Sequence, residues 1–306
     1  MSLKIVFMGT PDFSIPTLKT LLNSNHKILH VYSQPAKKAN RGQKISSTPI
    51  ELFSKENFLK IRTPESLDSE EEFNFLKDLN PDLVIVVAYG KIIPKRFLNI
   101  PKYGFLNVHA SLLPKWRGAA PIQRSIMNLD AETGISIMKI TEKLDAGPVI
   151  LQEKIKINEN IDTLTLSRVL SELGARAMLN SLDEIIDGKA KFIDQNHKQA
   201  TYAKKILKSE AKIDWKENAK SILAKINGLN PNPGAWFEYD NQRFKVWKAK
   251  IINEKNKVGT IINNNLTIAC RDQSIQILQI QKEGKNRQST EQFLTGNKIN
   301  KGIILN

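Results

Sequence analysis

The chain has 306 residues, of which 41% are hydrophobic, so it can bury a substantial core and favours two domains. Its single cysteine, Cys270, excludes an intramolecular disulfide framework and a cysteine-based metal site, which indicates a cytoplasmic protein. No stretch is long and apolar enough to span a bilayer, and the opening residues are typical of a first strand rather than a signal peptide. We therefore expect no membrane association.

Basic residues outnumber acidic ones by 46 to 31, which gives a formal net charge of +15. Residues 1–202 hold 27 basic and 22 acidic side chains, whereas residues 203–306 hold 19 and 9, a net charge of +10. A basic last third indicates a polyanionic partner. The alternative is that a composition rich in Lys, Ile and Asn has no functional meaning.

The first part of the chain alternates short apolar runs with helical spacing. Strands are expected over 3–8, 27–33, 82–88, 104–109, 134–140 and 149–157, and helices over 15–22, from Thr48-Pro49 onward and over 164–186. This alternation predicts an α/β fold with a doubly wound, mostly parallel, Rossmann-like sheet over residues 1–188. The turn after the first strand, Gly9-Thr-Pro-Asp12, lacks the glycine spacing of a dinucleotide-binding motif, so a nicotinamide cofactor is not expected.

The remainder of the chain has a different pattern. Residues 189–204 are polar and aperiodic, which predicts a linker. A helix near 217–226 is followed by short strand patterns over 235–239, 243–247, 258–262, 266–270 and 275–280. Short strands with one helix predict a small, partly open, OB-like β-barrel over residues 205–306. Such barrels present a basic face to oligonucleotides.

The candidate chemistry lies at the end of the strand 104–109. Asn107 and His109 are two residues apart, so a strand places both side chains on one face, at the edge where α/β sheets carry their sites. With Asp145 they supply the groups for acyl transfer to an amine: Asn107 and His109 can stabilise an oxyanion, while the carboxylate orients the imidazole and helps to remove the amine proton. Taken singly, each residue has a plainer explanation as a strand-end or turn residue.

The surrounding sequence resembles the folate-dependent formyltransferases, and within them those that act on methionyl-tRNA. The resemblance is carried by Asn107-Val-His-Ala-Ser-Leu-Leu-Pro-Lys-Trp-Arg-Gly-Ala-Ala-Pro-Ile-Gln-Arg124 together with the later Leu-Asp-Ala-Gly. Further matching segments are Phe7–Phe13, Val86–Gly90, Thr201–Lys205, Ile213–Trp215 and Lys245–Ala249, so the resemblance covers nearly the whole chain. It implies an enzyme that moves the formyl group of 10-formyltetrahydrofolate onto the α-amino group of methionyl initiator tRNA.

The resemblance also implies roles for individual residues. Asn107, His109 and Asp145 would be catalytic, and no metal would take part. Ser111 is not expected to be a nucleophile, because it lacks a glycine elbow and direct transfer needs no acyl-enzyme; it is expected to shape the turn. The residues expected to contact the folate are Ala88, Tyr89, Gly90, Ile93, Pro94, Ser111, Leu112, Leu113, Pro114 and Leu144.

Five basic residues are expected to contact the tRNA, namely Arg41, Lys44, Lys115, Arg117 and Lys205. Residues 34–44 are expected to be a basic, structureless insert, and a similar loop in the family reaches the acceptor stem. This chain has Ala36 where an acid is usual and Asn40 where glycine is usual. Lys115-Trp116-Arg117 is equally compatible with a solvated loop.

Two other functions stay open at this point. One is formylation of an amino-sugar nucleotide by the same catalytic core, although such a substrate would not require the basic C-terminal third. The other is a basic RNA-binding protein on a catalytically idle α/β scaffold, which the intact Asn107, His109 and Asp145 oppose. The enzyme is expected to be a monomer.

Overall fold

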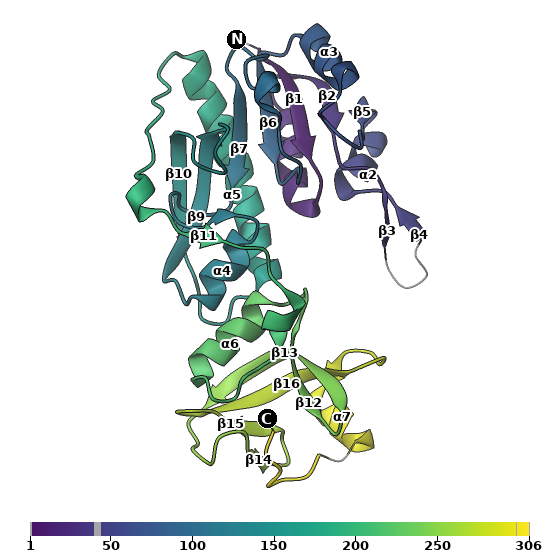
Figure 1. Cartoon of the computed structure of the whole chain (residues 1–306), viewed down its shortest axis with the longest axis vertical. Helices are drawn as coiled ribbons and strands as arrows, with labels where there is room; N and C mark the ends of the chain where they lie inside the picture. The colour runs from purple at the N-terminus through teal and green to yellow at the C-terminus, as the bar shows by residue number, and fades with distance from the viewer. Residues whose placement is uncertain (1, 40–43, 298, 306) are drawn as a thin grey trace. The chain divides into compact units, whose positions relative to one another are not determined.

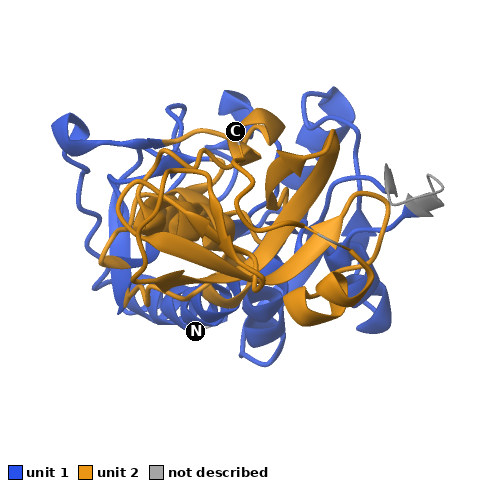
Figure 2. Ribbon diagram, turned by 90° about the horizontal axis from the view of Figure 1, so that it is seen from below, with its two compact units in different colours: residues 1–118, 133–155, 167–202 blue, residues 119–132, 156–166, 203–306 orange. Residues whose placement is uncertain are grey.

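The computed structural model describes residues 2–39, 44–297 and 299–305, which form two compact units coloured separately in Figure 2. The first unit comprises residues 1–118, 133–155 and 167–202, and the second comprises residues 119–132, 156–166 and 203–306. The second unit thus takes two segments from the middle of the chain as well as its last third. The functional division at residues 188 and 204 stays a prediction.

A mostly parallel sheet forms the centre of the first unit (Figure 1). Its strands run in the order β10 (Val149–Lys156), β9 (Glu132–Lys139), β7 (Phe105–His109), β6 (Leu83–Val87), β1 (Lys4–Gly9), β2 (Lys27–Tyr32) and β5 (Ile61–Arg62). From β7 to β5 the neighbours are parallel, whereas β9 is antiparallel to β7. The predicted α/β fold class is confirmed.

The apolar strand β6 lies between β1 and β7, and every residue of Leu83-Val-Ile-Val-Val87 is buried there. A run that is apolar on both faces is typical of a central parallel strand. By contrast, exposure alternates along β10 after its first two residues, as expected where a sheet has one covered face. Parallel pairing places the carboxyl ends of β6 and β7 side by side, and the candidate site lies there.

The helices of this unit begin at residues suited to capping them. They are α1 (Ile15–Leu22), α2 (Pro49–Glu56), α3 (Glu70–Leu79) and α5 (Thr163–Ile186), the last of which begins in a segment of the second unit. At α2, the Thr48 hydroxyl accepts the Glu51 N–H at 3.1 Å, with Pro49 at the first helical position. The structure thus confirms the predicted α1, α2 and α5, and adds α3, which was not predicted.

The basic segment after β2 differs from its prediction. Its described parts form an antiparallel pair, β3 (Lys37–Ala39) and β4 (Lys44–Ser46), so the expectation of a structureless insert is wrong for these residues. Backbone pairing between two short neighbouring strands leaves little trace in a polar sequence. Residues 40–43, which include Asn40 and Arg41, lie outside the described residues.

An antiparallel curled sheet with the helix α6 (Ala219–Gly228) forms the second unit. Its strands are β12 (Ala235–Tyr239), β13 (Gln242–Ile252), β16 (Ser274–Lys282), β15 (Thr267–Ala269) and β14 (Ile261–Asn263), in that spatial order, with β17 (Gln288–Ser289) on β16. The helices α4 (Pro121–Met127) and α7 (Thr290–Gly296) also belong to this unit. The predicted small barrel-like domain is confirmed.

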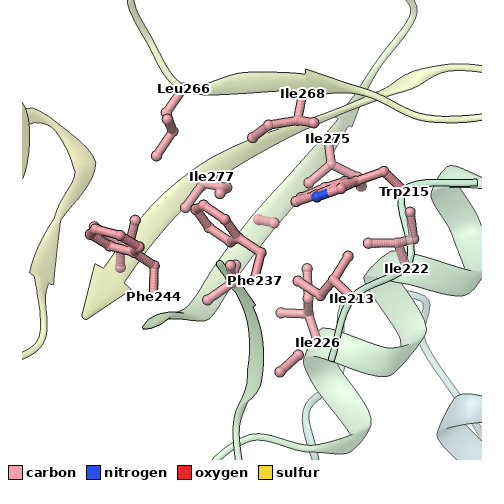
Figure 3. Packing of buried hydrophobic residues seen from close by; sticks show 14 of the residues in the cluster. Ile213, Trp215, Ile222, Ile226, Phe237, Phe244, Leu266, Ile268, Ile275 and Ile277 are labelled. Atoms are coloured by element: carbon pink, nitrogen blue, oxygen red, sulfur yellow. The ribbon is translucent and has the colours of Figure 1, made fainter. Parts of the chain in front are cut away.

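Aromatic and isoleucine side chains from several elements form the core of this second unit (Figure 3). The ring of Phe237 packs 5.8 Å from that of Trp215 and 5.6 Å from that of Phe244, measured between centroids. Burial of such large rings supplies much of the stability of a small sheet domain. Within the residues that the structure describes, no helix is both long and apolar enough to cross a membrane.

Candidate active site

Strand β7 places Asn107 and His109 on one face at the carboxyl end of the sheet. Asn107 pairs in register with Val86 of β6 and Met138 of β9, and His109 pairs with Ser136 of β9. The side chain of Asn107 is half-buried and, among the described residues, has no hydrogen-bond partner. Its amide N–H groups are therefore available to a ligand.

The imidazole of His109 is 5% exposed and lies between a carbonyl group and a carboxylate. Its Nε2 is 2.9 Å from the carbonyl oxygen of Trp116, and its Nδ1 is 3.7 Å from Asp145 Oδ2. Because a carbonyl oxygen only accepts, Nε2 carries the proton in this arrangement.

Asp145 lies in a tight turn between β9 and β10. Its backbone has a φ of 46°, in the left-handed region, and its carboxylate Oδ2 accepts the backbone N–H of Gly118 at 2.8 Å. Gly147 completes the turn, since a Cβ at that position would lie 1.8 Å from the carbonyl oxygen of Lys139. The turn thus holds the carboxylate beside His109.

Arg117 is buried, which corrects its place among the tRNA contacts. Its side chain is 4% exposed, and its guanidinium donates to Gln195 Oε1 at 3.0 and 2.7 Å and to His197 Nδ1 at 2.9 Å. A guanidinium enclosed in this way faces protein groups, so we no longer count Arg117 as a tRNA contact. The solvated-loop alternative is wrong for this residue too, whereas its neighbour Lys115 is exposed.

Ser111 has the turn-shaping place expected of it. Its side chain is fully buried, and its hydroxyl donates to the carbonyl oxygen of Lys115 at 2.6 Å. The hydroxyl of Ser136 donates to the Ser111 carbonyl oxygen at 2.6 Å and accepts the Leu113 N–H at 3.0 Å. These bonds fix the loop that follows β7.

The residues expected to bind folate fall into exposed and buried groups. Ala88, Gly90 and Leu144 are exposed, and Leu112, Ile93 and Pro94 are half-exposed. Tyr89 is 1% exposed and packs in the core cluster around β6, and its carbonyl oxygen accepts from Thr10 Oγ1 and Gln34 Nε2, so the whole residue is structural. Leu113 is buried against Met138 and Val149, while Pro114 is half-exposed.

The loops that carry these residues are joined by an ion pair. Lys95, after β6, lies 2.8 Å from Glu142, just before Asp145, measured from Nζ to Oε1. Both side chains are largely exposed. The loop after β6 and the loop before Asp145 therefore approach each other.

The remaining residues expected to contact tRNA are dispersed. Arg41 lies outside the described residues, and only the backbone of Lys44 is described, in β4. Lys115 is exposed in the first unit and Lys205 is exposed in the second. Within the part of the chain that the structure describes, no cluster of three or more His, Cys, Asp or Glu side chains could hold a metal ion.

Sequence reasoning missed three contributors to this site. Gln195 donates from Nε2 to the carbonyl oxygens of Asp145 and Gly147, at 2.9 and 2.7 Å, although it lies in the segment expected to be a linker. Gly118 and Trp116 contribute backbone groups. No local pattern marks such contacts, because they join positions that are 7 to 50 residues apart.

Comparison with known proteins gives the class of the molecule. Residues 3–182 match the formyl transferase family and residues 205–298 match the formyl transferase C-terminal domain. The chain therefore belongs to the formyl transferase family, and the predicted enzyme class is confirmed.

Individual proteins show which members of the family this chain resembles. A methionyl-tRNA formyltransferase from Pelagibacter ubique (strain HTCC1062) is 51% identical over 304 residues, which cover 99% of this chain and 98% of that protein. Among solved structures, HypX from Aquifex aeolicus in complex with tetrahydrofolic acid has a TM-score of 0.68 at 17% identity, over 98% of this chain and 50% of HypX. An N-formyltransferase from Helicobacter canadensis, in complex with folinic acid and dTDP-3-aminofucose, has a TM-score of 0.67 at 18% identity, over 92% of this chain and 99% of that one. At these identities the two structures support the fold alone.

Proposed function

We propose that this enzyme transfers the formyl group of 10-formyltetrahydrofolate to the α-amino group of methionine esterified to initiator tRNA. The observation that carries the proposal is the group of Asn107, His109 and Asp145 at the carboxyl end of β7. It occurs in a chain that is 51% identical to a methionyl-tRNA formyltransferase over nearly its full length. The same group of side chains is what transfer of a formyl group to an amine requires.

The proposed reaction begins when the amine nitrogen attacks the formyl carbon, which forms a C–N bond and an oxyanion. Asn107 donates to this oxyanion from its free amide, and His109 donates from Nε2–H, which it shares with the Trp116 carbonyl. Collapse of the intermediate breaks the bond between the formyl carbon and N10 of the donor. N10 then takes up a proton.

Asp145 serves the proton transfers in this proposal. Its carboxylate stabilises a protonated His109 across the 3.7 Å between Nδ1 and Oδ2, and it orients the ring. The proton that the attacking amine loses is taken up at the Asp145–His109 pair and passes from there to N10, so the proton balance closes within the site. A direct transfer of this kind needs no covalent enzyme intermediate.

The donor would lie beside the loops that follow β6 and precede Asp145. Exposed backbone at Ala88 and Gly90 and the exposed side chain of Leu144 offer polar and apolar contacts to a planar ring. Ile93, Pro94 and Leu112 extend this apolar surface. We keep these residues and Pro114 as proposed folate contacts, whereas the buried Tyr89, Ser111 and Leu113 would act through the packing of the loops that carry them.

The tRNA would bind to basic side chains in both parts of the chain. We retain Arg41, Lys44, Lys115 and Lys205, and we add Arg243, whose exposed guanidinium lies 3.9 Å from the ring centroid of Trp236. Arginine stacked on an aromatic ring is suited to phosphates and bases. In this proposal residues 1–188 are catalytic, residues 189–204 form the connection and residues 205–306 bind tRNA, in a cytoplasmic monomer without metal.

A substrate competition tests the function. Purified enzyme is incubated with formyl-labelled 10-formyltetrahydrofolate, methionyl initiator tRNA and an amino-sugar nucleotide such as dTDP-3-aminofucose. We expect label on the methionine amino group and none on the sugar. Label on the sugar alone would establish the amino-sugar alternative, and donor binding without any transfer would indicate an idle scaffold.

A further inference from the structure

The amide of Gln195 satisfies all of its hydrogen-bonding groups at the edge of the site. Its Oε1 accepts two N–H groups from Arg117, at 3.0 and 2.7 Å, and its Nε2 donates to the carbonyl oxygens of Asp145 and Gly147. Guanidinium only donates and carbonyl oxygen only accepts, so the amide has one possible orientation. Gln195 is 8% exposed, which shields these bonds from water.

Among the described residues, the side-chain hydrogen-bond partners of the buried Arg117 are neutral. They are the amide oxygen of Gln195 and Nδ1 of His197, at 2.9 Å. A buried cation gains less from neutral acceptors than from a carboxylate, so pairing of charges does not explain its place. A guanidinium offers a planar fork of donors, and here two of its N–H groups fix one oxygen.

The segment that holds Arg117 also touches both proposed catalytic groups. Trp116 offers its carbonyl oxygen to His109, and Gly118 donates its N–H to the Asp145 carboxylate. Between Trp116 and Gly118, Arg117 donates two hydrogen bonds to Gln195, and Gln195 donates to the backbone of the turn at Asp145. Gly118 thus anchors the carboxylate of Asp145, and Arg117, through Gln195, anchors its backbone, although φ at Asp145 is in the left-handed region.

The segment of Gln195 is itself tied to the sheet. Ile193 and Val149 exchange two backbone hydrogen bonds, each 2.8 Å long, at the start of β10. This bridge lies two residues from Gln195, so the glutamine is presented from a fixed backbone. Residues 193–197 therefore act as a strap across the turn of Asp145.

We propose that Gln195, oriented by Arg117, is a positioning residue that fixes the Asp145 carboxylate with respect to His109. The inference rests on the role of Asp145 in the proposed function. Loss of the two bonds from Nε2 frees the turn, and the carboxylate then drifts from the imidazole. A displacement of about 1 Å in such a group can reduce turnover on the order of 100-fold.

The decisive variant is Gln195→Glu. A glutamate can still accept from Arg117, but an ionised carboxylate cannot donate to the carbonyl oxygens of Asp145 and Gly147. We expect kcat to fall about 10- to 100-fold, with KM for both substrates within about threefold of the wild-type values. The matched control is Gln199→Ala, an exposed glutamine two residues beyond the strap, which should have wild-type kinetics.

A loss of activity caused by misfolding is distinguished from one caused by mispositioning by measuring the single-turnover rate per folinic-acid-binding site. A merely structural role predicts fewer binding sites with an unchanged rate at each, whereas positioning predicts a full set of sites and a slower rate. If Gln195→Glu does not fold, Arg117→Lys replaces it, because lysine keeps the cation but not the fork. Arg117→Lys should lower kcat by less than the loss expected for Gln195→Glu.

A near-normal single-turnover rate in the variant used would overturn the inference. The wild-type enzyme and His109→Ala are run in the same series. If the wild type transfers no formyl group to methionyl-tRNA, or His109→Ala is as fast as the wild type, the proposed function has failed rather than the role of Gln195. If both behave as proposed, the Gln195 result stands alone.

Discussion

The two units hold their polar groups in contrasting ways. In the first unit, His109 and Arg117 are almost fully buried, and most of their partners are neutral backbone or amide groups. In the second unit, Arg243 is exposed and lies over Trp236, and the last 104 residues carry a net charge of +10. The first arrangement suits chemistry that depends on position, and the second suits binding that adds many weak contacts.

This contrast has a physical consequence for how each unit responds to its surroundings. Buried hydrogen bonds depend steeply on geometry and little on salt, because no mobile ions reach them. Exposed charges tolerate small displacements but are screened, with a Debye length of about 10 Å at 0.1 M salt. Substitutions of the buried polar groups in the first unit should therefore alter rate, and those of exposed basic groups, such as Arg243 in the second unit, should alter affinity and its salt dependence.

The largest expected effect is on the catalytic group. Each of Asn107→Ala, His109→Ala and Asp145→Ala removes stabilisation of the transition state, so single-turnover rates should fall by roughly two to four orders of magnitude. Affinity for tRNA, measured separately by filter binding, should change little. Asp145→Asn is the sharper control, because an amide oxygen can still accept from Gly118 but cannot balance a protonated His109. Near-normal turnover in His109→Ala would contradict the assigned chemistry.

A smaller effect is expected at the exposed arginine of the second unit. Arg243→Gln should weaken tRNA binding several-fold at low salt and make the slope of log affinity against log salt shallower by about one unit. The rate at saturating tRNA should not change. The matched control is Arg176→Gln, an exposed arginine on α5 in the first unit. Equal salt slopes for both variants and the wild type would mean that the basic charge of the second unit is only compositional.

Much of the fold could be predicted because its signals are local. The run Leu83–Val87 is apolar on both faces, and Thr48-Pro49 carries its own helix start, so neither needs a distant partner to be recognised. Helix α3 was harder, because charged residues make up half of Glu70–Leu79. Its apolar residues, such as Phe73 and Leu76, can be recognised as a buried face only once they are seen packed against the sheet.

The candidate site divides in the same way. Asn107 and His109 could be predicted from their spacing on one strand, because alternation of side chains is a local property. Gln195 could not, since its partners Arg117 and Asp145 lie 78 and 50 residues away. The burial of Arg117 is decided by those same distant residues. A sequence that reads Lys115-Trp-Arg117 gives no sign of it.

The smallest predicted effect concerns an ion pair that joins two segments of the second unit. Arg124 of α4 donates to Glu210 through both terminal nitrogens, at 2.7 and 3.1 Å. Chiefly this hydrogen bonding holds the pKa of Glu210 below its ordinary value of 4.5.

A carboxyl group with a lowered pKa in the folded state stabilises the fold above its unfolded pKa, and that contribution is lost as the pH falls through the folded value. Glu210→Gln should therefore lower the free energy of unfolding by about 1 kcal/mol at pH 7, where a partly exposed pair contributes modestly, and by less at pH 3 to 4. Chemical denaturation at the two pH values, followed by tryptophan fluorescence, measures this difference. The control is Glu238→Gln, whose partner Lys212 lies 3.1 Å away with both side chains nearly half exposed, and which should change stability little at either pH. An equal loss for Glu210→Gln at both pH values would show that the pair stabilises through packing and neutral hydrogen bonds. The second unit would then resemble the first more closely than its surface charge suggests.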